Sequence, residues 1–338
     1  MKTQEELFSA IKCLPVAERE NVLKELDKIV NQASVEVSII QAGLYGEQAA
    51  CCPKCHSVRS RRNGKDVGVQ RYICNDCGKG FRANSGTVTA WLKKPELLKT
   101  YARYMFEGHS INKCAELTCI AYQTAFDWRH KILASMGKQQ RETVLSGICE
   151  SDDVFITHSE KGNKHLARKP RKRGKGIFEP KSKGIGKEKV AIIISTDRKG
   201  NKHLQAATRG RISKKDIDKV LKGRISKGSV LCTDSHRSYT AFAKSEKIEH
   251  QKIKASAKEF RRGIYHLQHV NNQAKQLKDW LDKFNGVSTK YLQNYLNWFA
   301  VKDKITHAAL PAITAITITL QSFTCWAEFK NITTNNIQ

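Results

Sequence analysis

The stretch Lys189-Val-Ala-Ile-Ile-Ile-Ser-Thr-Asp197 carries the clearest strand pattern in the chain. Its centre is apolar and rich in β-branched residues, which is typical of a strand buried on both faces of a sheet. A Lys199-Gly200-Asn201 turn and a second strand over residues 203–208 follow directly. The two strands therefore predict a β-hairpin.

Strands and helices alternate around this hairpin. Residues 145–157 predict an earlier strand, residues 213–221 a helix, and residues 229–233 a short buried strand. A further helix, a weak strand near residues 250–253 and a long helix from about His266 complete the series. The order β-β-β-α-β-α-β-α predicts an α/β domain with a mixed sheet over residues 144–300.

The composition excludes several classes of protein. The 338 residues include 60 Lys and Arg against 32 Asp and Glu, and the formal net charge of +28 favours nucleic acid as partner. The length suggests two or three domains, and the chain has no apolar run of the roughly 18 residues that span a membrane. Its first residues carry Glu5 and Glu6 and no apolar signal-peptide core, so a cytoplasmic protein is expected.

Four of the eleven cysteines form two close pairs, Cys52-x-x-Cys55 and Cys74-x-x-Cys77. Two such knuckles turn four thiolates toward one tetrahedral ion, which predicts structural zinc in a zinc ribbon over residues 49–90. The other cysteines are scattered and the total is odd, which fits a reducing compartment. Asn63-Gly64 predicts the turn of a hairpin between the knuckles. Basic residues nearby are candidate phosphate contacts, namely Arg61, Arg62 and Arg71.

Residues 91–138 predict a helix-turn-helix region that binds DNA. Ser110 can cap a short helix, a turn follows near residues 118–120, and a second helix places Ala125, Trp128 and Ile132 on one face. An ordinary helical hairpin is the alternative. If the second helix is a recognition helix, its first turn and its basic part contact DNA through Tyr122, Gln123, Thr124 and Arg129.

Three further segments complete the organisation. Residues 161–189 hold 12 Lys or Arg against two Glu, and predict a basic insertion that follows a DNA backbone through Arg171, Lys172 and Arg173. A loop that only aids solubility is the alternative. Residues 1–48 predict a helical N-terminal segment and residues 301–338 a C-terminal tail, and no chemistry is assigned to either.

Two aspartates stand at corresponding places on two predicted strands. Asp152 shares a strand face with Glu150, and Asp234 directly follows a later, central strand. If the strands are neighbours, the carboxylates lie side by side and require a hard divalent cation such as Mg²⁺ or Mn²⁺. Spacing alone favours the alternative, in which each is an ordinary surface or turn aspartate.

Several motifs together resemble one family. They are Cys52-Pro-Lys-Cys55, Arg71-Tyr72-x-Cys74-x-x-Cys77, Trp128-Arg129-His130, Gly147-Ile-x-Glu150-x-Asp152, Thr233-Asp234 and Thr289-Lys290-Tyr291-Leu292-x-Asn294-Tyr295. Over roughly residues 50–300 the chain resembles bacterial insertion-sequence transposases related to the eukaryotic Merlin elements. The resemblance implies an RNase H-like catalytic domain that binds two divalent ions through a DDE-type triad, cuts DNA by hydrolysis and joins it by transesterification.

The resemblance also implies site residues. Asp152 and Asp234 take the first two acidic positions, and Asn271 stands where a glutamate is usual. Asn271 offers a carbonyl oxygen but no negative charge, so weaker binding of the second ion is expected, with His269 as an alternative ligand. Lys278 matches the family's basic position and would hold a DNA phosphate; Lys275 shares its helix face with Asn271.

The leading hypothesis is a transposase that binds terminal inverted repeats in double-stranded DNA and acts at the bacterial nucleoid as a homodimer or higher oligomer. A catalytically decayed DNA-binding protein is the alternative, motivated by Asn271. A zinc-ribbon RNA-binding protein is the third, suggested by charge alone. Gly223-x4-Gly228 lacks the lysine of a phosphate-binding loop, so neither a nucleotide cofactor nor a membrane partner is expected.

Overall fold

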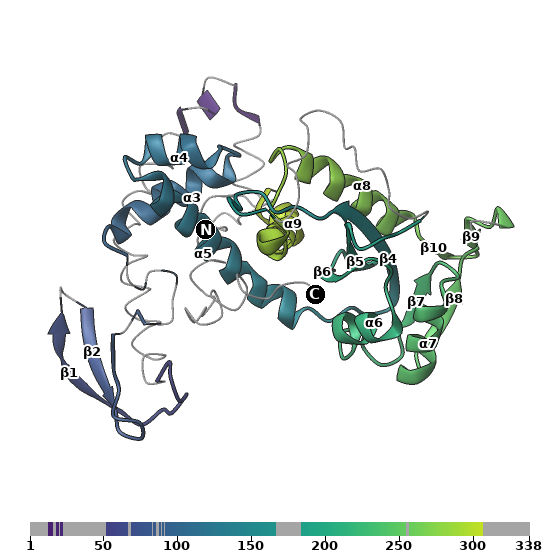
Figure 1. Ribbon diagram of the computed structural model, residues 1–338, viewed down its shortest axis with the longest axis horizontal. Coiled ribbons are helices and arrows are strands. Elements are labelled where there is room, and N and C mark those ends of the chain that lie inside the picture. The colour runs from purple at the N-terminus through teal and green to yellow at the C-terminus, as the bar shows by residue number, and fades with distance from the viewer. Residues whose placement is uncertain are drawn as a thin grey trace. The chain divides into compact units, whose positions relative to one another are not determined.

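The structure is a computed structural model, and it describes residues 52–66, 69–82, 92–166, 184–254 and 257–306, with a few isolated residues besides (Figure 1). The chain divides into two compact units, Met1–Ser85 and Gly86–Gln338, and each is described by itself. Most of segment 1–48, the centre of the basic insertion with Arg171, Lys172 and Arg173, and the chain after residue 306 lie outside the described residues.

The first unit contains a three-stranded antiparallel sheet in the order β1-β2-β3. The strands are β1 (Ser60–Asp66), β2 (Val69–Cys74) and β3 (Gly80–Arg82). Its apolar core is very small, with Phe81 stacked on Tyr72 at a ring-centroid distance of 5.5 Å beside the cysteine pairs. So small a core requires additional stabilisation, which a bound metal provides in comparable domains.

The predicted hairpin between the knuckles is confirmed, but the prediction that Asn63-Gly64 forms its turn is wrong. β1 continues through this pair to Asp66, which is paired with Val69. The pairing register shifts between Arg62 and Lys65, and Gly64 has a φ of 67°. Gly64 therefore occupies an irregularity inside the strand, where glycine accepts the left-handed conformation without strain.

The second unit is organised around a five-stranded mixed sheet in the order β6-β5-β4-β7-β8. The strands are β4 (Ile148–Thr157), β5 (Lys189–Asp197), β6 (Lys202–Arg209), β7 (Val230–Thr233) and β8 (Glu249–Lys252). Neighbours among β4, β5 and β6 are antiparallel, whereas β7 is parallel to β4 and β8 is parallel to β7. The predicted α/β domain with a mixed sheet is confirmed, with each strand within three residues of its expected start.

Helices cover both faces of this sheet (Figure 1). They are α6 (Lys214–Leu221), α7 (Arg237–Glu246), α8 (Gln268–Asp282) and α9 (Leu292–Thr306). Alternate side chains of β5 enter two separate cores: Ile192 packs in the core of α8 and α9, and Ile193 in the core of α6 and α7. The apolar run of β5 is thus explained by burial on both faces. A two-stranded ribbon, β9 (Arg261–Arg262) and β10 (Tyr265–His266), precedes α8.

The predicted helix-turn-helix consists of α4 (Ile111–Leu117) and α5 (Tyr122–Glu142), preceded by the short helix η1 (Pro95–Leu97) and α3 (Leu98–Phe106). Ser110 caps α4 by accepting a hydrogen bond from the Lys113 amide at 3.2 Å. The predicted inner face of α5 is buried in the core that also contains α8 and α9, so this region belongs to the same compact unit as the sheet. No helix in the described part of the chain is long and apolar enough to cross a bilayer.

Candidate active site and cysteine cluster

Four cysteine sulfurs converge in the first unit, all within 4.8 Å of one another. The Sγ atoms of Cys52 and Cys77 are 3.6 Å apart, and those of Cys55 and Cys74 are 3.5 Å apart. Ligands at about 2.3 Å from a tetrahedral zinc ion lie about 3.8 Å from one another, so this cluster is compatible with zinc. The Cys77 amide favours the thiolate and lowers the pKa of Cys74 to about 7, which suits a metal ligand.

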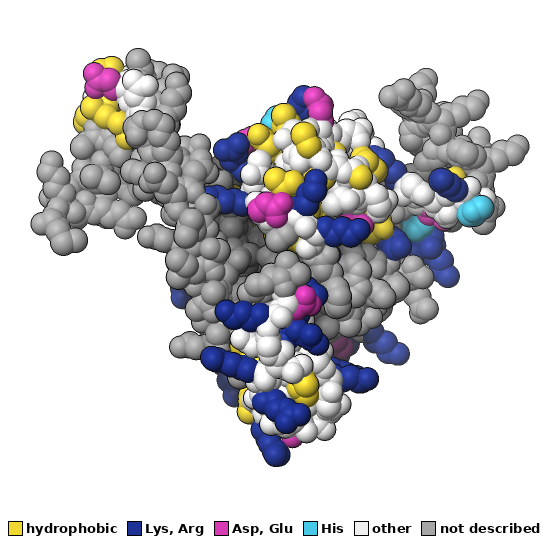
Figure 2. All heavy atoms as spheres, turned by 90° about the vertical axis from the view of Figure 1, so that its left-hand side faces the viewer, with side chains coloured by type: hydrophobic (Ala, Val, Ile, Leu, Met, Phe, Trp, Pro, Cys, Tyr) yellow, Lys and Arg dark blue, Asp and Glu magenta, His cyan; other side chains and the backbone are white. Residues whose placement is uncertain are grey.

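Basic side chains are prominent on the surface of this unit (Figure 2). Arg61 and Arg62 on β1 and Arg71 on β2 are exposed. Their guanidinium groups are therefore accessible to a ligand such as phosphate. They stay candidate contacts to DNA.

The candidate active site lies in the second unit, where β4 and β7 run parallel. Glu150 is paired with Cys232 at the end of this ladder, and Asp152 and Asp234 follow these two residues by two positions each. The same register would direct both side chains to one face, and the charge of Asp234 adds to the rise that burial causes in the pKa of Asp152, so the two carboxylates lie within electrostatic reach of each other. Asp234 follows the last residue of β7, where its Oδ1 accepts a hydrogen bond from the His236 amide at 2.9 Å, at the start of α7.

The pKa values of these acids are raised by burial and by one another's charges. Burial raises the pKa of Asp152 to about 7, and the charges of Asp153 and Asp234 add to the rise. Burial and the charge of Asp234 likewise raise the pKa of Asp153 to about 6. Carboxylates that repel one another in a partly desolvated place are stabilised by a cation, and hard oxygen ligands of this kind fit Mg²⁺ or Mn²⁺.

Asp153 was not among the residues predicted for the site. Strand alternation places its side chain on the face opposite Asp152, so no pattern in the sequence predicts that both belong to the site. The structure brings it near Asp234 at the edge where β7 ends. The position of Asp153 directly after Asp152 is the one signal in the sequence that could have indicated its role. That signal is ambiguous, because it does not tell which strand lies next to β4.

Helix α8 provides the remaining predicted residues. The charge of Lys278 acts on Asp152 and opposes the rise in its pKa, so this lysine lies beside the carboxylates. Asn271 lies two helical turns before Lys278 on the same face, and both it and Lys275 are exposed. The predicted buried stripe of α8 is confirmed, with Val270 and Leu277 fully buried.

Glu150 lies one strand repeat before Asp152 and is 1% exposed. Its Oε2 accepts hydrogen bonds from the amides of His269 and Val270 at 2.9 and 3.1 Å, in the first turn of α8. Its Oε1 lies 3.0 Å from Arg198 Nη2. The carboxylate therefore ties the start of α8 to the centre of the sheet, and both the helix dipole and Arg198 compensate its charge.

His266 and His269 also approach Glu150, and these three residues form a second possible metal-ligand set. The Arg198 guanidinium, however, lies among them: its Nη1 is 2.8 Å from His266 Nε2 and 3.0 Å from His269 Nδ1. An arginine keeps its charge at any accessible pH, so this site already holds a cation. His269, proposed above as a substitute for Asn271, is engaged here with Glu150 at 2.8 Å.

The predicted DNA contacts of α5 divide into two groups. Tyr122 is 53% exposed and Gln123 is exposed, whereas Thr124 is half-buried. Arg129 is 2% exposed and donates a hydrogen bond to the His109 carbonyl at 2.7 Å. The prediction that Arg129 contacts DNA is therefore wrong, because its guanidinium is used to hold the turn before α4 against α5.

Comparisons with known proteins agree with this geometry. Residues 144–302 match the profile of the ISXO2-like transposase domain. The chain is 24% identical over 261 residues to an uncharacterized protein in transposable element ISH50 of Halobacterium salinarum, covering 75% of this chain and 85% of that protein. A fold search also finds the pre-cleavage Mos1 transpososome, at 11% identity over 67% of this chain and 79% of that one, but with a TM-score of 0.21. The Mos1 paired-end complex with Mg follows at 13% identity over 73% and 79%, with a TM-score of 0.28.

TM-scores this low do not show a shared fold, and the similarity to transposases lies in the sequence matches. The matched segment begins just before β4 and ends inside α9, so it contains the whole mixed sheet and all four helices that cover it. It includes Asp152, Asp234 and Lys278. Residues 144–302 are similar to the ISXO2-like transposase domain, and together with the relative from a transposable element this match supports an insertion-sequence transposase.

Proposed function

We propose that this protein binds the terminal inverted repeats of its insertion sequence and cuts and joins DNA at a divalent-metal site formed by Asp152 and Asp234. The observation that supports the proposal is the parallel pairing of β4 with β7 up to Glu150 and Cys232, because the same register continued by two residues would set Asp152 beside Asp234. Burial, with smaller contributions from the charges of Asp153 and Asp234, raises the pKa of Asp152 to about 7, and a partly desolvated carboxylate of this kind is suited to bind a cation.

Each residue has a distinct role in this proposal. Asp152 and Asp234 hold the catalytic cations, and Asn271 contributes a carbonyl oxygen from α8. Lys278 holds the phosphate of the DNA strand close to the carboxylates, since its own charge already acts on Asp152. Two divalent cations, when bound, would activate the attacking oxygen and stabilise the leaving one during in-line displacement at phosphorus.

Asp153 bears on the charge that is missing at Asn271. Asparagine at this position removes one negative charge from the usual acidic triad. Asp153 adds a third negative charge that acts together with Asp234, although strand alternation directs its side chain to the face of β4 opposite Asp152. We infer that Asp153 contributes charge near the cation site without being a ligand beside Asp152, which favours an active enzyme over a decayed DNA-binding derivative.

The first unit acts as a DNA anchor in this proposal. Zinc bound by the four cysteines would stabilise the small sheet and present Arg61, Arg62 and Arg71 to the phosphate backbone. Helix α5 would read base edges with Tyr122 and Gln123. Because transposition joins two element ends, we expect at least two copies of the chain on the DNA.

The test is a cleavage assay on a duplex that carries the repeats flanking the gene. We expect Mg²⁺- or Mn²⁺-dependent nicking at the element boundary by the wild-type protein. Asp152→Ala and Asp234→Ala should lose nicking and keep binding of the ends. A wild-type protein that binds the repeats and never nicks them would favour the decayed alternative.

A further inference from the structure

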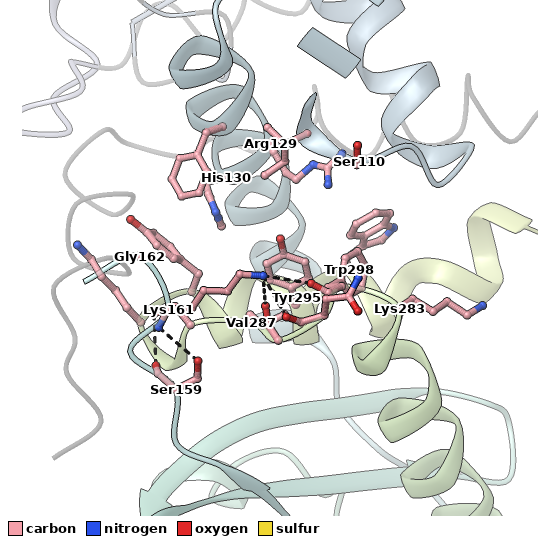
Figure 3. Close-up of a pocket in the computed structure, with 18 of the residues that line it drawn as sticks. Ser110, Arg129, His130, Ser159, Lys161, Gly162, Lys283, Val287, Tyr295 and Trp298 are labelled. Carbon is pink, nitrogen blue, oxygen red and sulfur yellow. Dashed lines mark hydrogen bonds between the residues drawn. The ribbon is translucent and has the colours of Figure 1, made fainter. Parts of the chain in front are cut away.

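A large groove separates the start of α5 from the loops that follow β4 and α8 (Figure 3). Its volume is about 1510 Å³. One wall carries Tyr122, Gln123 and His130 of α5, and the other is formed by residues 158–164 and 283–291. Both walls belong to the second unit, so the groove is a feature of one compact body.

The second wall is held by a dense set of hydrogen bonds. Lys161 Nζ donates to the carbonyl oxygens of Phe284, Asn285 and Gly286 at 3.3, 3.1 and 2.9 Å (Figure 3). The Ser159 amide donates to Thr289 Oγ1 at 2.8 Å, and the Thr289 amide donates to the Ser159 carbonyl at 2.8 Å. The segment after β4 and the segment after α8 therefore form one fixed surface.

The two walls are also joined to each other at the base of the groove. His130 of α5 stacks on Tyr291 at a ring-centroid distance of 4.2 Å, and its Nδ1 lies 3.1 Å from Asn294 Nδ2. His130 and Asn294 are 1% and 0% exposed. These contacts give a physical role to the Thr289–Tyr291 motif and its continuation into α9, which the active site leaves unexplained. They fix the helix-turn-helix relative to the catalytic sheet.

The groove is strongly basic. Lys164, Lys283 and Lys290 line it with exposed side chains, whereas Lys161 is committed to backbone carbonyls. Glu160 is the acidic residue among the lining side chains. Several exposed ammonium groups along one groove create a positive potential that attracts a polyanion.

The groove begins where β4 ends, and the same strand carries Asp152. Asp152 and the end of β4 are five residues apart, which corresponds to about 17 Å of extended strand. That distance is about half a turn of B-form DNA, whose full turn is roughly 34 Å long. A duplex seated in the groove could therefore reach the carboxylates without leaving the surface of this unit.

We propose that the groove binds the DNA duplex of the element end next to the cleavage site, with Lys283 and Lys290 on its phosphates and Tyr122 and Gln123 on its bases. This rests on the function proposed above and deepens it. One duplex would be held by the helix-turn-helix and the catalytic domain of the same chain. The rigid joint at His130 then sets how far the cut falls from the bases that are read.

The test uses the full chain with zinc and a duplex that carries the flanking repeats, in a series of salt concentrations. We expect the double variant Lys283→Gln, Lys290→Gln to bind about 10-fold more weakly at moderate salt. The slope of log affinity against log salt should fall in magnitude by about 2, since each lost phosphate contact contributes about 0.9. The matched control is Lys215→Gln, Lys219→Gln, two exposed lysines of α6 on the other face of the sheet.

Base contacts and phosphate contacts are expected to respond differently. The lysine variant should weaken binding to the repeats and to a scrambled duplex equally, whereas Gln123→Ala should reduce the preference for the repeats. Lys283→Arg, Lys290→Arg should restore binding if charge is what matters. Thermal melting of each variant separates loss of contacts from loss of fold.

Three results would overturn the proposal: a wild-type affinity and salt slope in the lysine variant, an equal loss in the α6 control, or tighter competition by single-stranded than by duplex DNA. None of these outcomes would affect metal-dependent cleavage by Asp152 and Asp234. Conversely, loss of binding in the lysine variant together with full cleavage by Asp152→Ala would retain the groove and reject the proposed active site.

Discussion

Two acids on strand β4 are one repeat apart on the same face, yet their surroundings are opposite. Glu150 is completely buried and is compensated by two helix amides and Arg198. Asp152 is half-buried and has no such compensation: burial, with a smaller contribution from the neighbouring carboxylates, raises its pKa to about 7. The protein supplies its own cation to Glu150, whereas we propose that Asp152 binds a cation from solution.

The difference separates structural from catalytic use of a carboxylate. A charge that is matched internally holds α8 in place and has little remaining capacity for a ligand. A buried carboxylate without a compensating partner lowers the free energy of unfolding and can still accept a metal ion. The function of α8 depends on both, because Glu150 anchors its first turn while Asp152 interacts with Lys278 further along.

The largest expected effect concerns catalysis. Asp152→Asn should reduce the rate of metal-dependent strand cleavage about 1000-fold or more, since it removes the charge that binds the cation. Glu150→Gln should remain within about 10-fold of wild type, because an amide oxygen still accepts from the α8 amides. Single-turnover cleavage at saturating protein measures both. Equal losses in the two variants would remove the functional distinction between the acids.

The second effect concerns stability. Glu150→Ala should lower the free energy of unfolding by about 3–5 kcal/mol, because it leaves Arg198 and two helix amides without their buried partner. Asp152→Ala should cause no comparable loss. Urea denaturation of the metal-free protein, followed by a spectroscopic signal from the second unit, compares the free energies of unfolding of the two variants. A Glu150→Ala protein as stable as wild type would show that the carboxylate does not anchor α8.

The third effect concerns pH. The folded-state pKa of Asp152 is about 7, above its usual value of 3.8, so the folded protein holds this proton more tightly than the unfolded chain. Stability that is present below pH 4 should therefore decline as the pH rises toward 7. Asp152→Asn should remove this decline and stabilise the metal-free protein by about 2 kcal/mol at pH 8, allowing for solvent screening. Saturating Mg²⁺ should abolish the advantage, and an advantage that grows toward low pH would contradict the assignment.

The smallest effect concerns the internal cation. Arg198→Lys should lower the free energy of unfolding by about 1 kcal/mol, because lysine keeps the charge but cannot reach Glu150, His266 and His269 together. Chemical denaturation at low and high salt measures this. If Arg198→Lys allowed Zn²⁺ to raise the melting temperature, the two histidines and Glu150 would form a metal site once the guanidinium is removed.

Local patterns predicted most of the elements. The β5 run, the Ser110 cap and the apolar face of α5 are each encoded within a few residues, and the structure agrees with all three. The Asn63-Gly64 turn failed because a glycine that accepts positive φ serves a strand irregularity as well as a turn. Local sequence cannot choose between these two uses.

The roles of charged residues were less predictable. Arg129 was expected on DNA because the end of α5 is basic, but its burial depends on the loop before α4 and on Cys114, far from it in the chain. Glu150 and Arg198 are separated by 48 residues, and nothing in either segment indicates that they pair. Asp153 was likewise not predicted, because Asp234, whose charge acts on it, follows another strand.

The amino-acid sequence by itself determined the cysteine knuckles, the order of strands and helices, and the family, because each is set by residues close together or by motifs shared with relatives. Only the tertiary structure decided which acids meet. A strand carries side chains on both faces, and the pairing of β4 with β7 selects Asp152 and Asp234 as neighbours while α8 and Arg198 take Glu150. Long-range pairing is a property of the packed sheet, and it brings aspartates from separate segments close enough for the metal site that we propose.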